Sequence, residues 1–329
     1  MSADTLVVPS RAVVLMPLRD DWTPAAELIR RLDRVISPQQ WTIDVLLIDD
    51  ASMTPCVAAD FQFDSTSVRS VRTLRLRRNL GHQRAIGIGF VYVATEMPCD
   101  AVVVMDADGE DTPEGVAELL RAFDGIGRER AVFAERIRRS EGVVFRLFYW
   151  LYRQIHWILT GIGVRVGNFS VLPFAYLDTL IVLSEIWNHY AAALFRSKLP
   201  FTTIPIARGV RISGESRMNF GALVAHGLSA ISVFGEIVGV RVLLVALAGS
   251  FLAAVGILVV VLIRLFTDYA IPGWATYAGG ILAIIVVQLV TLATTFTLFV
   301  LSNRASVGFI PLRDYKLFIA RTADVFRHE

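Results

Sequence analysis

The stretch VVVMDADGED, residues 102–111, places four carboxylates directly after a run of apolar residues. The apolar run is typical of a buried strand, and the Thr112-Pro113 pair that follows is typical of a helix start. The same arrangement occurs earlier, where the apolar run VLLIDDAS ends in Asp49 and Asp50. Apolar strands that alternate with helices predict an α/β fold with a mainly parallel sheet, covered on both faces.

Strands are expected at residues 12–18, 43–52, 71–79 and 100–108, and helices at 22–36, 80–97 and 112–123. Thr23 is the expected N-cap of the first helix, just before Pro24. Ligands of such sheets bind outside the carboxyl ends of the strands. We therefore expect Pro17, Asp49-Asp50 and Asp106-Ala107-Asp108 to line one crevice.

The acidic cluster suits a metal ion. Asp106, Asp108 and Glu110 alternate along the chain, so in an extended segment they lie on one side. Carboxylates gathered in this way repel one another unless a cation lies among them, and oxygen ligands favour Mg²⁺ or Mn²⁺. A metal held by few carboxylates completes its shell with phosphate oxygens, which makes a nucleoside diphosphate donor the expected partner. The alternative is a solvated acidic loop before a helix N-terminus.

Two long apolar segments predict a membrane hairpin. Residues 242–263 carry no charge, and residues 274–301 are mostly apolar and equally uncharged. About 20 apolar residues cross a bilayer as a helix. Several positive residues follow the second segment, whereas the linker holds only Arg264, and positive residues prefer the cytoplasmic side. We expect a multi-pass protein of the inner (cytoplasmic) membrane with its large domain in the cytoplasm; a hairpin buried in a soluble core is the alternative.

Two further segments are amphipathic candidates. Residues 142–163 are rich in aromatic side chains and too polar to span, so they suit either the lipid interface or a core helix. Residues 218–238 lead straight into the first apolar segment.

The chain has two cysteines, Cys56 and Cys99, which form neither a disulfide framework nor a metal-ligand pattern. The net charge of +2 is small, and no nucleic-acid partner is expected.

Four motifs, taken in their order and spacing, resemble the family 2 glycosyltransferases with a GT-A fold. They are MPLRDD (16–21), LLIDDAS (46–52), RNLGHQRAIGIG (78–89) and VVVMDADGEDTPE (102–114). The later RGVRISGESRMNF (208–220) and the hairpin narrow the resemblance to polyprenyl-phosphate glycosyltransferases of the dolichol-phosphate mannose synthase and bacterial GtrB type. The resemblance covers essentially the whole chain.

This resemblance implies a metal-dependent, inverting hexosyltransferase that moves a sugar from a nucleotide-sugar donor to a polyprenyl (undecaprenyl) phosphate. A UDP-sugar is expected in preference to a GDP-sugar, and a tetramer is the oligomer that family likeness suggests. One alternative is a non-processive transferase that glycosylates a lipid hydroxyl. Another is an inactive GT-A domain that serves as a membrane scaffold.

The resemblance also implies roles for single positions. The residues assigned to the nucleotide pocket and its loop are Pro17, Asp20, Asp49, Asp50, Asn79 and Gly81. Those assigned to the metal and diphosphate are Asp106, Asp108 and Glu110. Those assigned to phosphate groups are Arg136, Arg208, Arg211, Ser216 and Arg217, because the guanidinium fork matches phosphate oxygens. Among all of these, Asp106, Asp108, Arg211 and Arg217 are expected to act in catalysis.

One departure from the family pattern concerns the acceptor. Asn168 in VGNFSVL occupies the position where bacterial relatives carry Gly-Asp-Phe, whose Asp is a proposed base. An amide cannot take a proton, but a lipid phosphate is already an anionic nucleophile and needs no base. A hydroxyl acceptor would need one, and His189 is the one nearby candidate, although a histidine of this kind is more often a hydrogen-bonded structural residue.

The predicted organisation has four parts. A cytoplasmic GT-A domain covers residues 1–217, and a juxtamembrane amphipathic helix covers 218–238. Two transmembrane helices lie within 239–303, at about 242–263 and 274–301, and a basic cytoplasmic tail covers 304–329.

Overall fold

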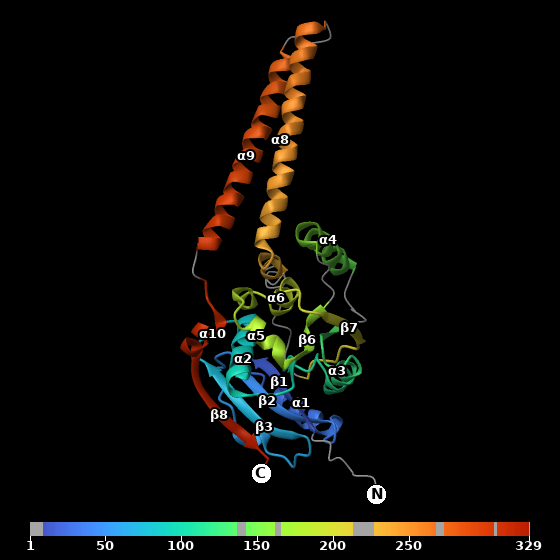
Figure 1. Cartoon of the computed structure of the whole chain (residues 1–329), viewed down its shortest axis with the longest axis vertical. Helices are drawn as coiled ribbons and strands as arrows, with labels where there is room; N and C mark the ends of the chain where they lie inside the picture. Colours follow the sequence, from blue (N-terminus) through green and yellow to red (C-terminus); the bar gives the residue numbers. More distant parts are fainter. Residues whose placement is uncertain are drawn as a thin grey trace. The chain divides into compact units, whose positions relative to one another are not determined.

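Eight strands form one mixed sheet in the computed structural model, in the order β7-β5-β6-β4-β1-β2-β3-β8 (Figure 1). They are β1 Ser10–Leu18, β2 Trp41–Asp49, β3 Val68–Leu76, β4 Ala101–Val104, β5 Ala131–Arg136, β6 Val166–Pro173, β7 Phe201–Ile206 and β8 Ile319–Arg327. β6 is antiparallel to both neighbours and β8 is antiparallel to β3, whereas the remaining pairs are parallel. The predicted mainly parallel α/β sheet is confirmed.

The structure describes residues 9–136, 143–161, 166–212, 227–267, 273–305 and 308–328. The chain divides into two units. Unit 1 comprises residues 1–150, 164–233 and 309–329, and unit 2 comprises residues 151–163 and 234–308. Unit 1 contains the sheet, and unit 2 contains the two long apolar helices.

The helices of unit 1 are α1 Trp22–Val35, α2 His82–Glu96, α3 Pro113–Gly125, α5 Leu177–Leu180, α6 Tyr190–Arg196 and α10 Pro311–Asp314. Alternate side chains of β1 enter separate cores because successive residues of a strand point to opposite faces. Val14 and Met16 pack in the core that α1 and α3 cover, whereas Val13 and Leu15 pack in the core under α2, α5 and α6. Figure 1 shows these two helical layers on the sheet.

The two expected helix starts have different outcomes. Thr112 caps α3 as expected, since its hydroxyl accepts the Gly115 N–H at 3.1 Å and Pro113 occupies the first turn. The expected cap at Thr23 is wrong, because α1 already begins at Trp22. The indole Nε1 of Trp22 donates to the Thr54 carbonyl at 3.0 Å, which ties the start of the helix to the loop after β2.

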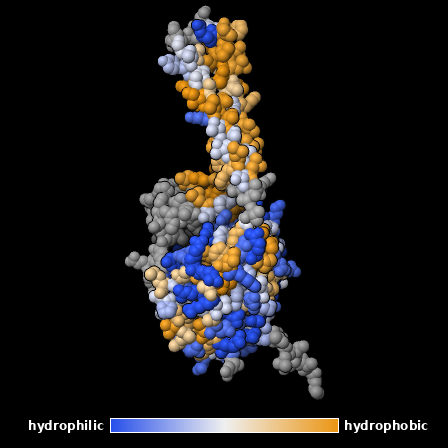
Figure 2. Space-filling model, turned by 90° about the vertical axis from the view of Figure 1, so that its left-hand side faces the viewer, coloured by the Kyte–Doolittle hydropathy of each residue, from blue (hydrophilic) through white to orange (hydrophobic). Residues whose placement is uncertain are grey.

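Unit 2 holds α8 Gly235–Phe266 and α9 Trp274–Ala305, and both are long and apolar enough to cross a membrane. Most of their side chains are exposed, and Figure 2 shows hydrophobic residues along this hairpin. The predicted spans 242–263 and 274–301 lie within the two helices. Gly249 and Gly256 of α8 lie against Leu289 and Leu282 of α9, so small residues allow close packing within the hairpin.

The expected juxtamembrane helix at 218–238 falls partly on residues 213–226, which lie outside the described part of the chain. Residues 227–232 are helical, and α8 begins soon after them. The other amphipathic candidate is helical as α4, Val143–Thr160, which contributes residues to both units.

The segment after the hairpin is more than the basic tail that was expected. Residues 319–327 form β8 at the edge of the sheet, where Phe326 stacks on Phe63 with ring centroids 4.9 Å apart. Arg72 of β3 also pairs with Asp324 at 2.5 Å. Because unit 1 contains residues on both sides of the hairpin, both ends of the hairpin connect to the same unit.

Candidate active site

Three parallel strands bring acidic residues to one edge of the sheet. β1 lies between β2 and β4, with Leu18 opposite Asp49 and Leu15 opposite Val104. The residues that follow β2 and β4 therefore leave the sheet at its carboxyl edge. This is where the sequence predicted the ligand crevice.

The loop after β4 is shaped by its own carboxylates. The Asp106 N–H donates to Asp111 Oδ2 at 3.0 Å, and the Glu110 N–H donates to Asp108 Oδ1 at 2.9 Å. Gly109 lies between them at φ +94°, a conformation that favours glycine. The sequence DADGED therefore builds a tight turn that presents its remaining carboxylate oxygens at the sheet edge.

A basic segment after β7 lies on this acidic loop. Arg211 Nη2 contacts Asp108 Oδ2 at 2.5 Å, and the guanidinium of Arg208 pairs with Glu110. Backbone bonds reinforce the contact, because the Gly209 N–H donates to the Glu110 carbonyl at 2.9 Å. A Cβ at Gly209 would lie 2.6 Å from Thr112 Cγ2, so only glycine allows so close an approach. The structure thus brings together the predicted Asp108, Glu110, Arg208 and Arg211.

The three predicted metal ligands each face a different partner. Asp108 and Glu110 pair with the two arginines, and Asp106 Oδ1 lies 3.2 Å from His82 Nε2. In the described ranges, no group of three His, Cys, Asp or Glu side chains is placed to hold a metal. The expected convergence is therefore not seen there, and the metal role of these residues stays a prediction.

Electrostatic crowding is nevertheless marked at Asp108. Burial raises its pKa, and the neighbouring charges of Asp106 and Glu110 add to the rise, while the Glu110 N–H and Arg211 oppose them. Hard carboxylate oxygens in a crowded, partly buried group are the donor set that a divalent cation favours. By donor chemistry, Asp106 and Asp108 fit Mg²⁺ or Mn²⁺.

The acidic residues assigned to the nucleotide pocket also accept hydrogen bonds from backbone N–H groups of nearby loops. Asp49 is buried, and its Oδ1 accepts the Ser52 N–H at 2.6 Å. Both oxygens of Asp50 accept backbone amides, from Leu80 at 2.6 Å and from Gly81 at 2.9 Å. Asp50 therefore fixes the loop that leads into α2, a role that residue type alone did not reveal.

Asp20 belongs to the same edge. Its Oδ1 accepts the backbone N–H groups of Met53 and Thr54 at 2.7 and 2.9 Å, which joins the loop after β1 to the loop after β2. The remaining pocket residues lie along this region: Pro17 within β1, Asn79 exposed before α2, and Gly81 at φ +92° as the N-cap of α2. Their contacts with a nucleotide stay predictions.

Three of the predicted phosphate ligands are less fully placed. Arg136 is the last residue of β5, and the orientation of its side chain lies outside what is described. Ser216 and Arg217 fall within 213–226, also outside the described residues. Their roles stay predictions.

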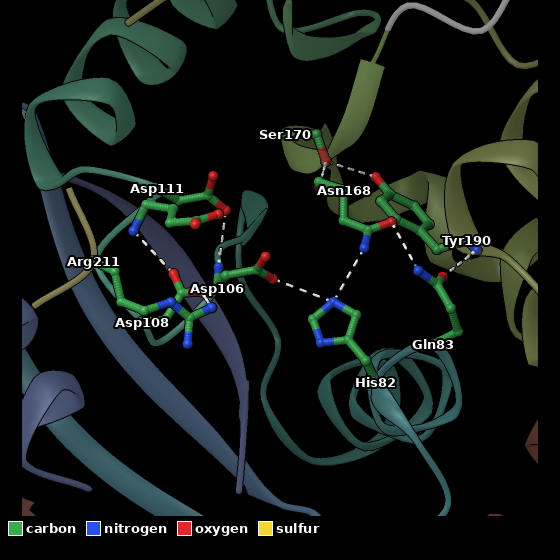
Figure 3. A network of polar contacts seen from close by, with 10 residues as sticks. His82, Gln83, Asp106, Asp108, Asp111, Asn168, Ser170, Tyr190 and Arg211 are labelled. Atoms are coloured by element: carbon green, nitrogen blue, oxygen red, sulfur yellow. Dashed lines mark hydrogen bonds and ion pairs between the residues drawn. The ribbon is translucent and has the colours of Figure 1, made fainter. Parts of the chain in front are cut away.

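His82, the first residue of α2, is a site residue to which the sequence analysis assigned no role (Figure 3). Its Nε2 lies 3.2 Å from Asp106 Oδ1 and 3.1 Å from Asn168 Nδ2. Desolvation acts to lower the pKa of His82, but the carboxylate of Asp106, and to a smaller degree those of Asp111 and Asp108, outweigh this and raise it. A protonated Nε2 can donate to Asp106 and a bare Nε2 can accept from Asn168, so the nitrogen serves one contact at a time.

Behind His82 lies a network that joins α2, β6 and α6 (Figure 3). Gln83 Nε2 donates to Asn168 Oδ1 at 3.2 Å, and Gln83 Oε1 accepts the Tyr190 N–H at 2.8 Å. The Tyr190 hydroxyl lies 2.9 Å from Ser170 Oγ, and burial raises the pKa of Tyr190 so that this hydroxyl keeps its proton. The order of the strands, which places β6 beside β4, was the information needed to find this network.

His189, the candidate base for a hydroxyl acceptor, is the N-cap of α6 and is buried. Its Nδ1 accepts the Ala192 N–H at 3.4 Å. This contact is of the structural kind that the sequence offered as the alternative, and a catalytic role for His189 stays a prediction.

Comparison with known proteins identifies the family. Residues 14–181 match the family model described as glycosyl transferase family 2. The chain belongs to this family. The matched residues run from β1 through the acidic loop and the Asn168 strand, so the match covers most of the site.

Two relatives illustrate the similarity of this family 2 chain to other members. It is 26% identical over 273 residues to the uncharacterized glycosyltransferase YkcC of Bacillus subtilis (strain 168), a match that covers 80% of each chain. It is 24% identical over 273 residues to the undecaprenyl-phosphate 4-deoxy-4-formamido-L-arabinose transferase of Salmonella choleraesuis (strain SC-B67), covering 80% of this chain and 78% of the relative.

A solved structure shows the same fold. Glucosyl-3-phosphoglycerate synthase from Mycobacterium tuberculosis, in complex with Mn²⁺, UDP-glucose and phosphoglyceric acid, aligns with a TM-score of 0.50. The alignment has 15% sequence identity and covers 70% of this chain and 80% of that one. The expected GT-A fold is confirmed, and the chain is a glycosyltransferase family 2 member with two candidate membrane helices.

Proposed function

We propose that this protein is a membrane-bound, inverting glycosyltransferase that moves a sugar from a nucleotide diphosphate donor to a polyprenyl phosphate such as undecaprenyl phosphate. The observation that carries the proposal is the pairing of Arg211 and Arg208 with the acidic loop at Asp108 and Glu110. Two arginines beside clustered carboxylates make a site for phosphate groups that are bridged by a divalent ion. The relative named as an undecaprenyl-phosphate transferase supports the choice of acceptor.

The donor would bind at the carboxyl edge of the sheet. Asp106 and Asp108 would hold Mg²⁺ or Mn²⁺, and the ion would neutralise charge on the diphosphate. Asp49, with the loops that Asp20 and Asp50 hold, would border the nucleoside. We infer a UDP-sugar rather than a GDP-sugar, supported by the UDP-glucose in the solved structure of similar fold.

The reaction needs no proton transfer at the acceptor. An anionic phosphate oxygen of the lipid attacks the anomeric carbon, and a new carbon–oxygen bond forms on the face opposite the donor. The bond from the anomeric carbon to the donor diphosphate breaks, and its electron pair leaves with the diphosphate oxygen. Arg208 and Arg211 would stabilise the negative charge that develops there, which is the largest contribution expected in such a site.

Exposed apolar side chains support a lipid acceptor. The part of α4 that belongs to unit 2 exposes the apolar side chains of Leu151, Ile155, Trp157 and Ile158, while His156 is buried. The guanidinium of Arg241 in α8 donates to the Ile158 carbonyl at 2.5 Å, which holds the end of α4 to the first candidate span. An apolar helix face that is fixed to a membrane helix suits the lipid interface.

We further propose an inner-membrane location with unit 1 in the cytoplasm. Both ends of the α8–α9 hairpin connect to unit 1, which supports two spans with both ends on one side of the membrane. The positive residues after α9 support the cytoplasmic side. A homotetramer stays a proposal from family likeness.

The test is transfer of radiolabel from UDP-glucose, UDP-galactose, UDP-GlcNAc and GDP-mannose by the purified full chain with Mg²⁺ or Mn²⁺. Undecaprenyl phosphate is compared with a neutral glycolipid extract, and Asp108→Ala serves as the inactive control. Label on undecaprenyl phosphate that is lost in Asp108→Ala is the expected result. Label only in the neutral lipid would establish the hydroxyl-acceptor alternative, and no metal-dependent donor binding at all would favour the scaffold.

A further inference from the structure

We propose that Gln83 is a positioning residue, which turns the side-chain N–H of Asn168 toward the site so that this position donates a hydrogen bond to the acceptor phosphate. The inference rests on the proposed function and deepens it, since it names the group that receives the anionic acceptor. It also accounts for an amide where a carboxylate base would be expected.

The polarity of the network is fixed by one backbone group. The Tyr190 N–H can only donate, so the atom of Gln83 that lies 2.8 Å from it is the acceptor Oε1. The other terminal atom of Gln83 is therefore Nε2, which donates to Asn168 at 3.2 Å. The atom of Asn168 that receives this bond is Oδ1, and its Nδ2 must point the other way. No choice of amide orientation remains open along this chain.

Burial makes the orientation persistent. Gln83 is 9% exposed and Tyr190 is fully buried, so a reversed Gln83 would leave two donors facing each other without water to separate them. Asn168 is held from its backbone as well, since its carbonyl accepts from Ser170 Oγ at 2.8 Å. The carboxamide of Asn168 is thus locked at one end and open at the other.

The open end faces the reaction centre. Asn168 Nδ2 lies 3.1 Å from His82 Nε2, and His82 Nε2 lies 3.2 Å from Asp106 (Figure 3). Nδ2 carries two N–H groups, and His82 Nε2 accepts at most one of them, when that nitrogen carries no proton. The second is suited to an anionic oxygen that approaches the acidic end of β4. An ionised carboxylate at position 168 would have no N–H to donate to this oxygen.

The experiment measures equilibrium binding of a short-chain prenyl phosphate and of the matching prenyl alcohol to the full chain in detergent. The variants are Gln83→Glu, Asn168→Asp, Asn168→Ala and Gln83→Glu/Asn168→Ala, and Gln39→Glu adds the same charge at an exposed turn as a control. An ionised carboxylate at position 83 attracts the Asn168 N–H and reverses the amide. At pH 8.5 we expect Gln83→Glu and Asn168→Asp to lose about tenfold or more in affinity for the phosphate, with the alcohol and Gln39→Glu unchanged.

Two readouts separate positioning from a structural effect. In the Asn168→Ala background, Gln83→Glu should have no further effect on phosphate affinity, because no amide remains to be turned. At pH 6 the defect of Gln83→Glu should shrink, because a protonated carboxyl donates to Asn168 Oδ1 as the native amide does. A defect of equal size in both backgrounds, or no loss in Gln83→Glu or Asn168→Asp at pH 8.5, would overturn the inference.

The binding measurement needs no sugar nucleotide, so it is independent of turnover. If no donor supports sugar transfer, the proposed function is wrong. The comparison of prenyl phosphate affinity between the variants can still be interpreted in that case. If sugar transfer is observed but the affinity for the prenyl phosphate does not change in the Gln83 and Asn168 variants, only the inference about Gln83 is wrong.

Discussion

Arg211 Nη2 lies 2.5 Å from Asp108 Oδ2, although 103 positions separate the two residues in the chain. The contact joins the segment after β7 to the loop after β4. A donor diphosphate with its metal would lie at this junction. The pairing therefore holds the basic segment against the charged groups of the acidic loop.

Arg211→Ala should reduce kcat by about 100-fold, the order expected when one charge-stabilising donor is removed. The midpoint of thermal unfolding should change little, because Arg211 contacts a loop and not a core. Arg31→Ala is the matched control, since Arg31 of α1 pairs with Glu114 of α3 at 3.0 Å, 83 positions away, and neither residue is assigned to the site. Arg211→Lys should recover only part of the rate, as an ammonium lacks the guanidinium fork. Equal losses in Arg31→Ala and Arg211→Ala would contradict a specific role.

Gly209→Ala should weaken turnover about tenfold or more by separating the two loops. The added methyl would lie 2.6 Å from Thr112 Cγ2, so the basic segment must move away and carry Arg208 and Arg211 with it. Steady-state rates with the labelled donor measure this loss. Gly125→Ala is the control, because nothing lies within 4 Å of the methyl it would add. Full activity in Gly209→Ala would show that the close approach of the two loops is not required.

Asp33→Asn should destabilise unit 1 by about 1–3 kcal/mol at neutral pH. Burial would raise the pKa of Asp33, but hydrogen bonds from the backbone of Ser67, Val68 and Thr66 and from the Ser65 hydroxyl lower it below 3.8. The ionised form is thus the stabilising one. Its contribution is complete above the unfolded pKa and is lost as pH falls through the lower folded pKa.

Thermal unfolding of the full chain in detergent at several pH values measures this effect. The gap between wild type and Asp33→Asn should be largest near pH 7, should begin to narrow below about pH 4 and should close as pH falls through the lowered folded pKa. Asp64→Asn, at an exposed position nearby, should unfold like wild type throughout. A gap that stays constant down to pH 3 would contradict the role of the ionised carboxylate.

Phe326→Ala should loosen the sheet edge at β3. Phe326 is 8% exposed and stacks on Phe63, and loss of a buried phenylalanine costs about 3 kcal/mol or more. Limited proteolysis should cut unit 1 faster while the α8–α9 hairpin stays membrane-bound. Leu317→Ala, in the same segment but 70% exposed, is the control. Equal protease resistance in the two variants would mean that β8 contributes little to the domain.

The sequence predicted the features that depend on local pattern. The strands around 12–18 and 43–52, the cap at Thr112 and the acids at strand ends follow from apolar runs and their terminating residues. The grouping of Arg208 and Arg211 with Asp108 came from family resemblance. The contact of His82 with Asp106 could not be predicted from the residue pattern, because it depends on how the start of α2 and the end of β4 meet in the folded chain.

β8 and the Gln83 network were missed for related reasons. The edge strand β8 has the sequence IARTADVFR, which contains several charged side chains. Such charges keep an edge strand from pairing with other chains, but in the sequence alone they are equally typical of a solvated tail. Gln83 and Asn168 are 85 positions apart and meet only because β6 runs antiparallel beside β4. Such contacts depend on the order of strands, which residue pattern does not encode.

The position of β8 sets an order of assembly. β3 forms its outer hydrogen bonds with residues 319–327, which are synthesised after both helices of the hairpin. Until then the edge of β3 presents unpaired N–H and C=O groups, which are prone to pair with other chains. The hairpin is therefore synthesised before the sheet of unit 1 can be completed. A chain whose two apolar helices are not yet accommodated would carry them between β7 and β8 of its own sheet, so the edge strand can join the sheet only after the hairpin has been made.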